Sequence, residues 1–314
     1  MSSTIKLFIQ IPCFNEEKTI KPTLEAIPKK IEGIDSISIV VIDDGSTDNT
    51  IKMAKENGAD FIIKHKSNLG LARSFMSGIE FCIKKKADII INTDGDNQYF
   101  AEDMKKLVHP ILNDNADVVI GARPIDGIKH FSYFKKLLQK IGSWTVRQFS
   151  STKVLDATCG FRAYTAEAAK ILNVFNTYTY TIETIIQLGF LNKDIVSVPV
   201  RVNEKTRESR LMKSIFEYVL RSMFIILRVY LFYKPFKFFS YLSLFFFAPG
   251  FILVLRFFYY YFQNPDISQY TQSLTTGLFS ILISFLIFSI ALITDLISVN
   301  RNLLEKILRK EKDD

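Results

Sequence analysis

The chain has 314 residues, enough for one large domain or two smaller ones. Its net charge of +8 favours an anionic partner, but the basic residues cluster near the C-terminal end and in polar loops, which argues against nucleic acid. Three widely spaced cysteines without a CxxC pair indicate free, mostly buried thiols rather than a disulfide framework. The N-terminus is too polar and short for a signal peptide, so we expect the first 230 residues to stay cytoplasmic.

The first 125 residues alternate between short apolar runs and helical stretches. β-branched and other apolar residues predict strands at 7–12, 37–42, 61–63, 87–93 and 118–123. Helices are expected between them, to about residue 30, over 51–57 and over about 70–85. This alternation predicts an α/β fold, with a mostly parallel sheet, right-handed crossovers and helices on both faces.

Polar residues follow three of these strands directly. They are Pro12–Glu16, Asp43-Asp44 and Asp94–Gln98. Because ligands bind at the carboxyl ends of parallel strands, we expect the three segments to converge on one edge of the sheet. Carboxylates there can accept hydrogen bonds from a nucleotide base or from ribose hydroxyls. The absence of GxGxxG and GxxxxGK[ST] from the sequence argues against an ordinary dinucleotide site or P-loop.

The segment Asp94-Gly95-Asp96-Asn97-Gln98 carries two carboxylates two residues apart. Taken alone, it is as typical of an ordinary turn as of a binding site. Two hard oxygen ligands with a nearby amide suit Mg²⁺ or Mn²⁺, held partly by the protein and partly by substrate phosphates. The two other polar strand ends favour the second interpretation.

Three motifs in this order resemble the family 2 (GT-A fold) glycosyltransferases: Ile11–Glu17, Val41–Asp48 and Thr93–Gln98. The resemblance covers about residues 5–212. Within the family, the chain most resembles the branch of dolichol-phosphate mannose synthases and undecaprenyl-phosphate sugar transferases. The resemblance implies a Rossmann-like nucleotide-sugar-binding domain. The nucleotide-sugar residues that it implies are Pro12, Phe14, Asn15, Glu16, Asp43, Asp44, Asp94, Gly95 and Asp96. It implies that Asp94, Asp96 and Gln98 hold the metal.

The segment from His130 to about Phe149 mixes basic and apolar residues. On its residues alone it reads as an amphipathic core helix with a solvated basic face. The resemblance implies instead that this region brings cations to a lipid-linked acceptor phosphate. The acceptor-side candidates are then Arg123, Lys135, Lys136 and Ser143.

The segment Asp156–Tyr164 resembles a family signature that forms a tight turn near the donor sugar. Arg162 could meet a phosphate or pair with Asp156, and both alternatives stay open. Glu183, in the first turns of a predicted helix, could contact sugar hydroxyls or be structural. The three histidines have no metal-ligand spacing and are expected to be surface or core residues.

A proline-containing, edge-type strand at 196–202 leads into a polar loop, 203–213. The loop resembles one that closes over the donor in the family, with Arg207 in place of a glycine and Arg210 in place of a lysine. Together with Arg201, these two could clamp phosphates through bidentate hydrogen bonds. Without the resemblance, a solvated charged loop is the simpler interpretation.

The C-terminal third is predicted to meet a membrane. Residues 214–233 read as a basic amphipathic helix at a membrane interface or, alternatively, as a buried soluble helix. Residues 238–255 and 267–294 carry no charge and predict two transmembrane helices. Basic flanks place both termini in the cytoplasm and the short loop outside, at the plasma membrane in a prokaryote. The expected domains are 1–212 (glycosyltransferase), 213–235 (juxtamembrane helix), 236–300 (two spans) and 301–314 (basic tail).

The hypothesis that follows is an inverting transferase that moves a sugar from a UDP- or GDP-linked donor to a polyprenyl phosphate. Asp94, Asp96 and Arg123 are its expected catalytic residues, with Mg²⁺ or Mn²⁺ as cofactor and the bilayer as partner. An alternative acceptor is a glycolipid or polysaccharide hydroxyl, for which Glu183 or Asp156 would be the general base. A membrane-tethered binding protein is the non-enzymatic alternative, which the intact Asp94/Asp96 pair argues against. A homo-oligomer is compatible with every version.

Overall fold

The computed structural model describes residues 4–125, 133–150, 152–174, 179–203, 215–263 and 270–313, with side chains undescribed at 133–135, 215–222, 302 and 305–313. The chain divides into two compact units, Met1–Val229 and Tyr230–Asp314. The domain boundaries expected from the sequence, at residues 212, 235 and 300, stay predictions. The two units are described separately below.

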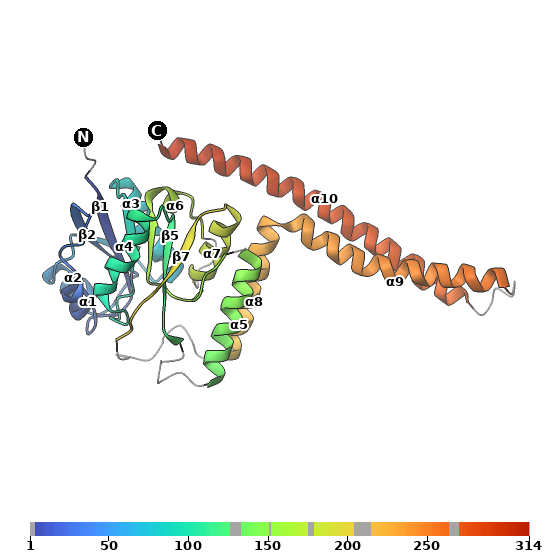
Figure 1. Cartoon of the computed structure of the whole chain (residues 1–314), viewed down its shortest axis with the longest axis horizontal. Coiled ribbons are helices and arrows are strands. Elements are labelled where there is room, and N and C mark those ends of the chain that lie inside the picture. The colour runs from blue at the N-terminus through green and yellow to red at the C-terminus, as the bar shows by residue number, and fades with distance from the viewer. Residues whose placement is uncertain are drawn as a thin grey trace. The chain divides into compact units, whose positions relative to one another are not determined.

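A mostly parallel β-sheet forms the centre of the first unit (Figure 1). In the described residues it has seven strands in the order β3-β2-β1-β4-β6-β5-β7, and only β6 runs antiparallel to its neighbours. The strands are β1 (Lys6–Cys13), β2 (Ser36–Asp43), β3 (Phe61–Lys64), β4 (Ile89–Asn92), β5 (Val118–Ala122), β6 (Arg162–Thr165) and β7 (Ile195–Pro199). The predicted α/β class and its parallel core are confirmed. They arise because strands buried on both faces read as continuous apolar runs.

Helices flank the sheet on both sides (Figure 1). The helices of the first unit are α1 (Ile20–Ala26), α2 (Thr50–Glu56), α3 (Leu71–Lys84), α4 (Met104–Asn113, preceded by a 3-10 turn at Ala101–Asp103), α6 (Ala166–Lys170) and α7 (Thr181–Phe190), with α5 (Tyr133–Ser150) packed on α7. Helix α8 (Ile215–Tyr233) runs across the boundary between the two units. Helix α1 ends before the expected residue 30. Ile27 already has an extended backbone, with ψ of 127°, because the residue before a proline is kept out of the helical region.

Strand β6 is the element of the sheet that the sequence did not indicate. It inserts between β4 and β5 and pairs with both in antiparallel register, so that Asn92 and Ile120 each lie opposite Arg162. Gly121 also donates its N–H to the Phe161 carbonyl, at 2.9 Å. This insertion brings the turn at 156–160 next to the end of β4, where Asp94 begins the polar segment.

The second unit is a helical hairpin of α9 (Pro235–Gln263) and α10 (Thr271–Asp313). The helices pack through small residues: Ser243 and Ser284 hydroxyls lie 2.9 Å apart, and Ser280 donates to the Phe246 carbonyl at 2.7 Å. A Cβ added at Gly250 would lie 3.0 Å from the Gly277 carbonyl oxygen, so the backbones approach closely.

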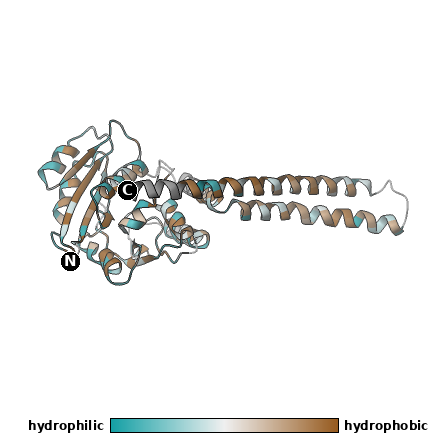
Figure 2. Ribbon diagram, turned by 90° about the horizontal axis from the view of Figure 1, so that it is seen from above, coloured by the Kyte–Doolittle hydropathy of each residue, from teal (hydrophilic) through white to brown (hydrophobic). Residues whose placement is uncertain are grey.

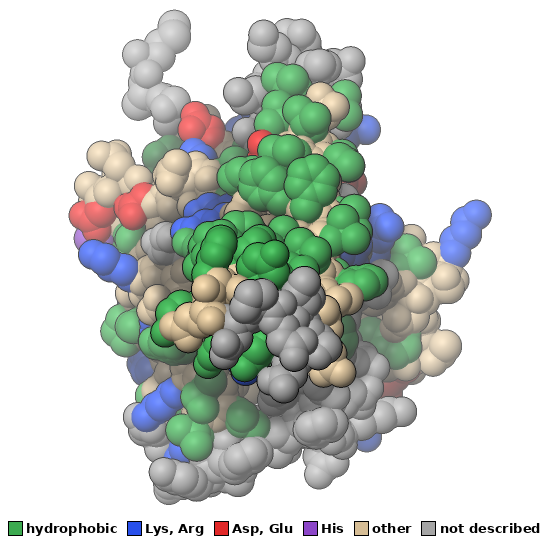
Figure 3. Space-filling view, turned by 90° about the vertical axis from the view of Figure 1, so that its right-hand side faces the viewer, with side chains coloured by type: hydrophobic (Ala, Val, Ile, Leu, Met, Phe, Trp, Pro, Cys, Tyr) green, Lys and Arg blue, Asp and Glu red, His purple; other side chains and the backbone are tan. Residues whose placement is uncertain are grey.

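Both hairpin helices are long and apolar enough to cross a membrane, by length and composition. Helix α9 has 29 residues, which at the α-helical rise is roughly 44 Å, more than a hydrocarbon core needs. Hydrophobic residues predominate along both helices (Figure 2), and hydrophobic side chains gather on the face shown in Figure 3. Phe245, Phe262 and Phe285 are each exposed by more than 60%. Contiguous apolar area of this kind is unfavourable in water. It therefore indicates a surface that meets a membrane or a protein partner.

Candidate active site

The loops after β1 and β2 are tied together by side-chain-to-backbone hydrogen bonds. Asn15 donates its N–H to the Ser46 hydroxyl at 2.9 Å and accepts the Thr47 N–H on Oδ1 at 2.8 Å. The Glu16 N–H donates to Thr50 Oγ1 at 2.8 Å. Asn15 has a left-handed backbone, with φ of +54°, which Asn tolerates better than most residues. The first two predicted polar strand ends are therefore one connected structure.

Asp44 is buried, and its carboxylate holds the loop that precedes α3. It accepts the N–H groups of Leu69 and Gly70, each at 2.9 Å, and lies 2.8 Å from His65 Nδ1. His65, read from the sequence as a surface or core residue, thus fixes this acidic strand end, and its Nε2 meets the Ser77 hydroxyl at 3.1 Å. No local sequence signal links residues 44 and 65, because the contact depends on the pairing of β2 with β3.

Gly45 allows the loop after β2 to contact the loop that precedes α3. Its φ is +77°, and an added Cβ would lie 2.7 Å from the Ser67 carbonyl carbon. Gly58 is a matched control, because its φ is +98° and nothing lies within 4 Å of an added Cβ.

Both Gly45→Ala and Gly58→Ala are expected to destabilise the protein through backbone strain. Gly45→Ala should lose about 1–3 kcal/mol more, because the clash is with backbone that cannot swing aside. Urea unfolding of both variants measures the difference. Equal losses would show that the loops separate without cost.

An acidic cluster forms around Cys13, at the end of β1. Burial raises the pKa of the Cys13 thiol well above its ordinary value, and the negative charges of Glu16, Asp43, Asp94 and Asp96 raise it further. A Cβ added at Gly95 would lie 2.6 Å from Cys13 Sγ and 3.6 Å from the Pro12 carbonyl oxygen. The structure therefore brings the three predicted strand ends together at one edge of the sheet.

The Asp94–Gln98 segment is held in a turn. Asp96 Oδ1 accepts the Gln98 N–H at 3.2 Å, and Asn97 has a φ of +54°. Asn203, which no sequence pattern singled out, donates its side-chain amide to the carbonyls of Asn97 and Tyr99 at 2.9 and 3.2 Å.

Cation chemistry fits this donor set in part. Within the described residues, no group of three or more His, Cys, Asp or Glu side chains is arranged to hold a metal ion. Asp94 and Asp96 contribute carboxylates within a cluster of four negative charges. Two protein carboxylates with the remaining positions filled by substrate phosphates is the arrangement that Mg²⁺ commonly takes.

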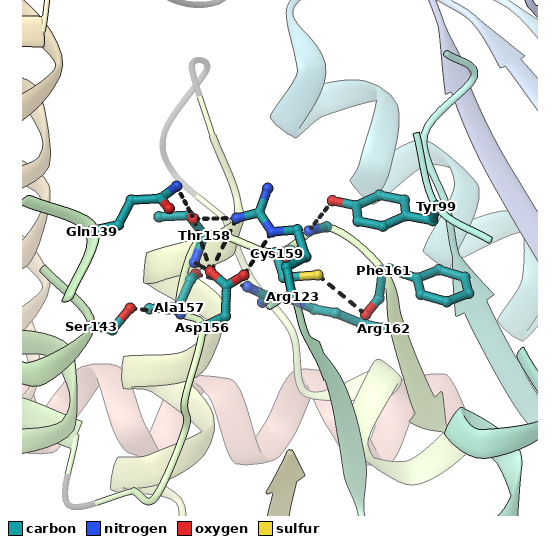
Figure 4. A network of polar contacts seen from close by, with 11 residues as sticks. Tyr99, Arg123, Gln139, Ser143, Asp156, Ala157, Thr158, Cys159, Phe161 and Arg162 are labelled. Atoms are coloured by element: carbon teal, nitrogen blue, oxygen red, sulfur yellow. Dashed lines mark hydrogen bonds and ion pairs between the residues drawn. The ribbon is translucent and has the colours of Figure 1, made fainter. Parts of the chain in front are cut away.

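Arg123 and Asp156 form a buried ion pair (Figure 4). Arg123 Nε donates to Asp156 Oδ2 at 2.6 Å and Nη2 donates to Oδ1 at 3.1 Å, with side chains 8% and 1% exposed. Nη2 also donates to Thr158 Oγ1 at 2.7 Å. Burial alone would raise the pKa of Asp156, but the Arg123 charge and these hydrogen bonds outweigh it and lower the pKa.

Arg162 does not pair with Asp156, which corrects one of the two alternatives left open by the sequence. Its fully buried guanidinium donates to the carbonyls of Ala157, Cys159 and Thr181 at 2.7–3.0 Å. Burial would lower the pKa of Arg162, but surrounding hydroxyl and thiol groups raise it above the ordinary value. Arg162 thus holds the turn from inside the core, and none of these contacts involves a carboxylate.

The other predicted site residues differ in burial and in their contacts. The Ser143 hydroxyl is buried and accepts the Ala157 N–H at 3.2 Å, while Phe14 and Lys136 are half-buried. Arg201 is exposed, pairs with Asp103 and stacks on Phe100 at 3.8 Å. Glu183 is buried in the first turn of α7. The Lys135 side chain, Arg207 and Arg210 lie outside the described residues.

Comparison with known proteins gives a consistent result. Residues 8–172 match the family model described as glycosyl transferase family 2. The UDP-N-acetylglucosamine–dolichyl-phosphate N-acetylglucosaminyltransferase of Methanococcus voltae is 30% identical over 189 residues, covering 53% of this chain and 72% of that protein. The dolichol-phosphate mannosyltransferase of Pyrococcus furiosus is 27% identical over 225 residues, covering 68% and 62%.

Among solved structures, the fold is similar to that of glucosyl-3-phosphoglycerate synthase from Mycobacterium tuberculosis, solved with Mn²⁺, UDP and glucosyl-3-phosphoglycerate. The TM-score is 0.56 and the identity 18%, covering 72% of this chain and 79% of that one. At this identity the likeness establishes the fold alone.

Proposed function

The chain belongs to glycosyl transferase family 2 and is a glycosyltransferase, and from this premise we propose that it transfers a sugar from a nucleoside-diphosphate donor to a polyprenyl phosphate. The observation that carries the donor half is the convergence of Glu16, Asp43, Asp94 and Asp96 around Cys13 at the carboxyl edge of the sheet. The relatives named above, which act on dolichyl phosphates, support the acceptor half.

On the donor side, we assign the metal to Asp94, Asp96 and Gln98. A bound Mg²⁺ or Mn²⁺ would supply charge neutralisation for the departing diphosphate. We assign the nucleotide side of the site to Asn15, Glu16, Asp43 and Asp44, together with Pro12, Phe14 and Gly95. Arg207 and Arg210, in the polar loop 203–213, are assigned to the same donor. The Asp44 carboxylate is already bonded to the Leu69 and Gly70 N–H groups and to His65. Its contribution is therefore to fix the loop that precedes α3 at the nucleotide side of the site.

On the acceptor side, a phosphate is already ionised at neutral pH, so the reaction needs cations and positioning rather than a general base. The candidates are Arg123, Lys135, Lys136 and Ser143. The lowered pKa and full pairing of Asp156 make it a weak base, which disfavours a hydroxyl acceptor that would depend on it.

A lipid-linked acceptor also agrees with the surface of α5. Leu137, Ile141 and Trp144 are 41–55% exposed and lie four and three residues apart, on one side of this helix. An exposed apolar stripe of this kind favours a membrane surface over the solvated basic face expected from the residues alone. We propose that α9 and α10 cross the bilayer as an anchor, with both termini cytoplasmic and the loop between them outside.

The experiment that tests this function is a donor panel. Full-length protein in detergent, with Mn²⁺ and undecaprenyl phosphate, is incubated with radiolabelled UDP-, GDP- and dTDP-linked sugars. We expect label to move into the lipid with one nucleotide class strongly preferred. Binding of a donor without transfer to any lipid acceptor would instead favour a sugar-nucleotide-binding protein with a degenerate site.

A further inference from the structure

Gly160 lies directly against the carboxylate of Asp94. A Cβ added at Gly160 would lie 3.2 Å from each Asp94 carboxylate oxygen and 2.9 Å from the Tyr180 hydroxyl oxygen. The first distance is tighter than ordinary van der Waals contact, and the second is closer than real Cβ atoms come. Asp94 therefore packs against backbone that has room for it only because residue 160 has no side chain.

Side chains fix both backbone polar groups of Gly160. Its N–H donates to the hydroxyl of Tyr99 at 3.0 Å (Figure 4), and its carbonyl accepts from Asn92 Nδ2 at 2.9 Å. The Tyr180 hydroxyl donates to the same carbonyl at 3.3 Å and accepts from Asn92 Nδ2 at 2.7 Å. Asn92 comes two residues before Asp94, and Tyr99 directly follows Gln98. The turn and the predicted metal segment are thus bonded to each other at both ends.

Tyr180 has little freedom to move away. Its ring is buried and stacks on Phe75 with ring centres 3.8 Å apart and planes 1° from parallel. Gln10 Nε2 donates to Asn92 Oδ1 at 2.9 Å, which leaves the Asn92 amide directed at Gly160 and Tyr180. Burial and then the nearby Asp94 charge raise the pKa of Tyr180 well above its ordinary value, so its hydroxyl keeps its proton at neutral pH.

We propose that Tyr180 and Asn92 are positioning residues for the metal site, which act by clamping Gly160 against the Asp94 carboxylate. This inference rests on the proposed function, in which Asp94 holds the metal. Groups that orient a metal ligand commonly change metal affinity by about 10–100-fold when they are altered, although they do not touch the metal themselves. Tyr180, Asn92 and Gly160 therefore determine how well Asp94 is presented to the metal and the donor diphosphate.

The test measures metal affinity directly. Mn²⁺ binding to full-length protein is followed by electron paramagnetic resonance with UDP and, separately, GDP present. We expect Gly160→Ala to weaken Mn²⁺ binding by about 10–100-fold and Tyr180→Phe by about tenfold, and excess Mn²⁺ to restore part of the lost transfer rate. Gly142→Ala is the matched control for the first variant, because nothing lies within 4 Å of an added Cβ there. Tyr164→Phe, another buried tyrosine that faces Phe75, is the control for the second.

The outcomes separate the inference from the proposed function. If Gly160→Ala and Tyr180→Phe bind Mn²⁺ as the wild type does while Asp94→Asn does not, the positioning role is wrong and the metal site stands. If the wild type binds no Mn²⁺ with either nucleotide, the proposed metal site fails and the positioning role fails with it. If Gly160→Ala does not fold, Tyr180→Phe alone tests the positioning role, since it removes one hydroxyl group and keeps the buried ring.

Discussion

Asp94→Asn is expected to lower kcat for sugar transfer by about 10²–10³-fold, comparable to the loss of one preorganised electrostatic contact in other active sites. The substitution keeps the shape of the side chain and removes its charge. The negative cluster around Cys13 would lose one of its four carboxylates. Transfer rates at saturating donor and metal measure the effect.

The control for this variant is Asp114→Asn, which removes the same charge at an exposed position after α4. It should leave kcat unchanged. Because like charges in a cluster repel one another, Asp94→Asn should also leave the unfolding midpoint equal or higher. A near-normal kcat for Asp94→Asn with saturating Mn²⁺ would show that Asp94 does not bind the metal.

Asp156→Ala should lower the free energy of unfolding by about 3–5 kcal/mol, because it leaves the buried Arg123 guanidinium without its counter-ion. The pair is bidentate and Asp156 is 1% exposed at its side chain. The double variant Arg123→Met/Asp156→Leu should recover much of this loss, since a buried pair can often be replaced by apolar residues at little cost. Urea unfolding of both variants and of the wild type measures the loss and the recovery.

The same pair predicts a pH dependence. The folded pKa of Asp156 is lowered, so its contribution to stability is fully present above the unfolded value of about 3.9 and is lost as the pH falls through the folded pKa. The stability gap between wild type and Asp156→Ala should therefore be constant near neutral pH and shrink in strong acid. A loss for Asp156→Ala no larger than that of an exposed substitution, or a gap that grows in acid, would contradict this account of the pair.

The architecture was largely predictable because its parallel core is made of apolar, β-branched runs at regular spacing. Residues 37–42 and 87–93 read as buried strands, and the rule that parallel strands present their carboxyl ends together predicted that Asp43 and Asp94 would meet. Their common effect on Cys13 agrees with that expectation.

Strand β6 was not predictable on the same basis. Arg162-Ala163-Tyr164-Thr165 is short and has no turn partner nearby, and its antiparallel insertion is decided by β4 and β5, which lie far away in sequence. The partner of Asp156 followed from that insertion. Arg162, six residues along the chain, was a natural candidate, but β6 directs its guanidinium to backbone carbonyls and leaves Arg123 to pair with Asp156.

His65, Asn203 and Tyr180 were missed for a related reason. Each acts on a residue at least 20 positions away, through a contact that exists only once the sheet has formed. A single histidine, asparagine or tyrosine carries no spacing pattern that would single it out in one sequence.

The central claim, transfer to a lipid-linked phosphate, is tested most directly by two acceptors that differ only in that group. Full-length protein in detergent, with Mn²⁺ and the donor preferred in the panel, is given undecaprenyl phosphate or undecaprenol at equal concentration. We expect a labelled glycosyl-phosphoryl lipid from the phosphate and no product from the alcohol. Product from the alcohol, or only from an added glycolipid hydroxyl, would contradict it.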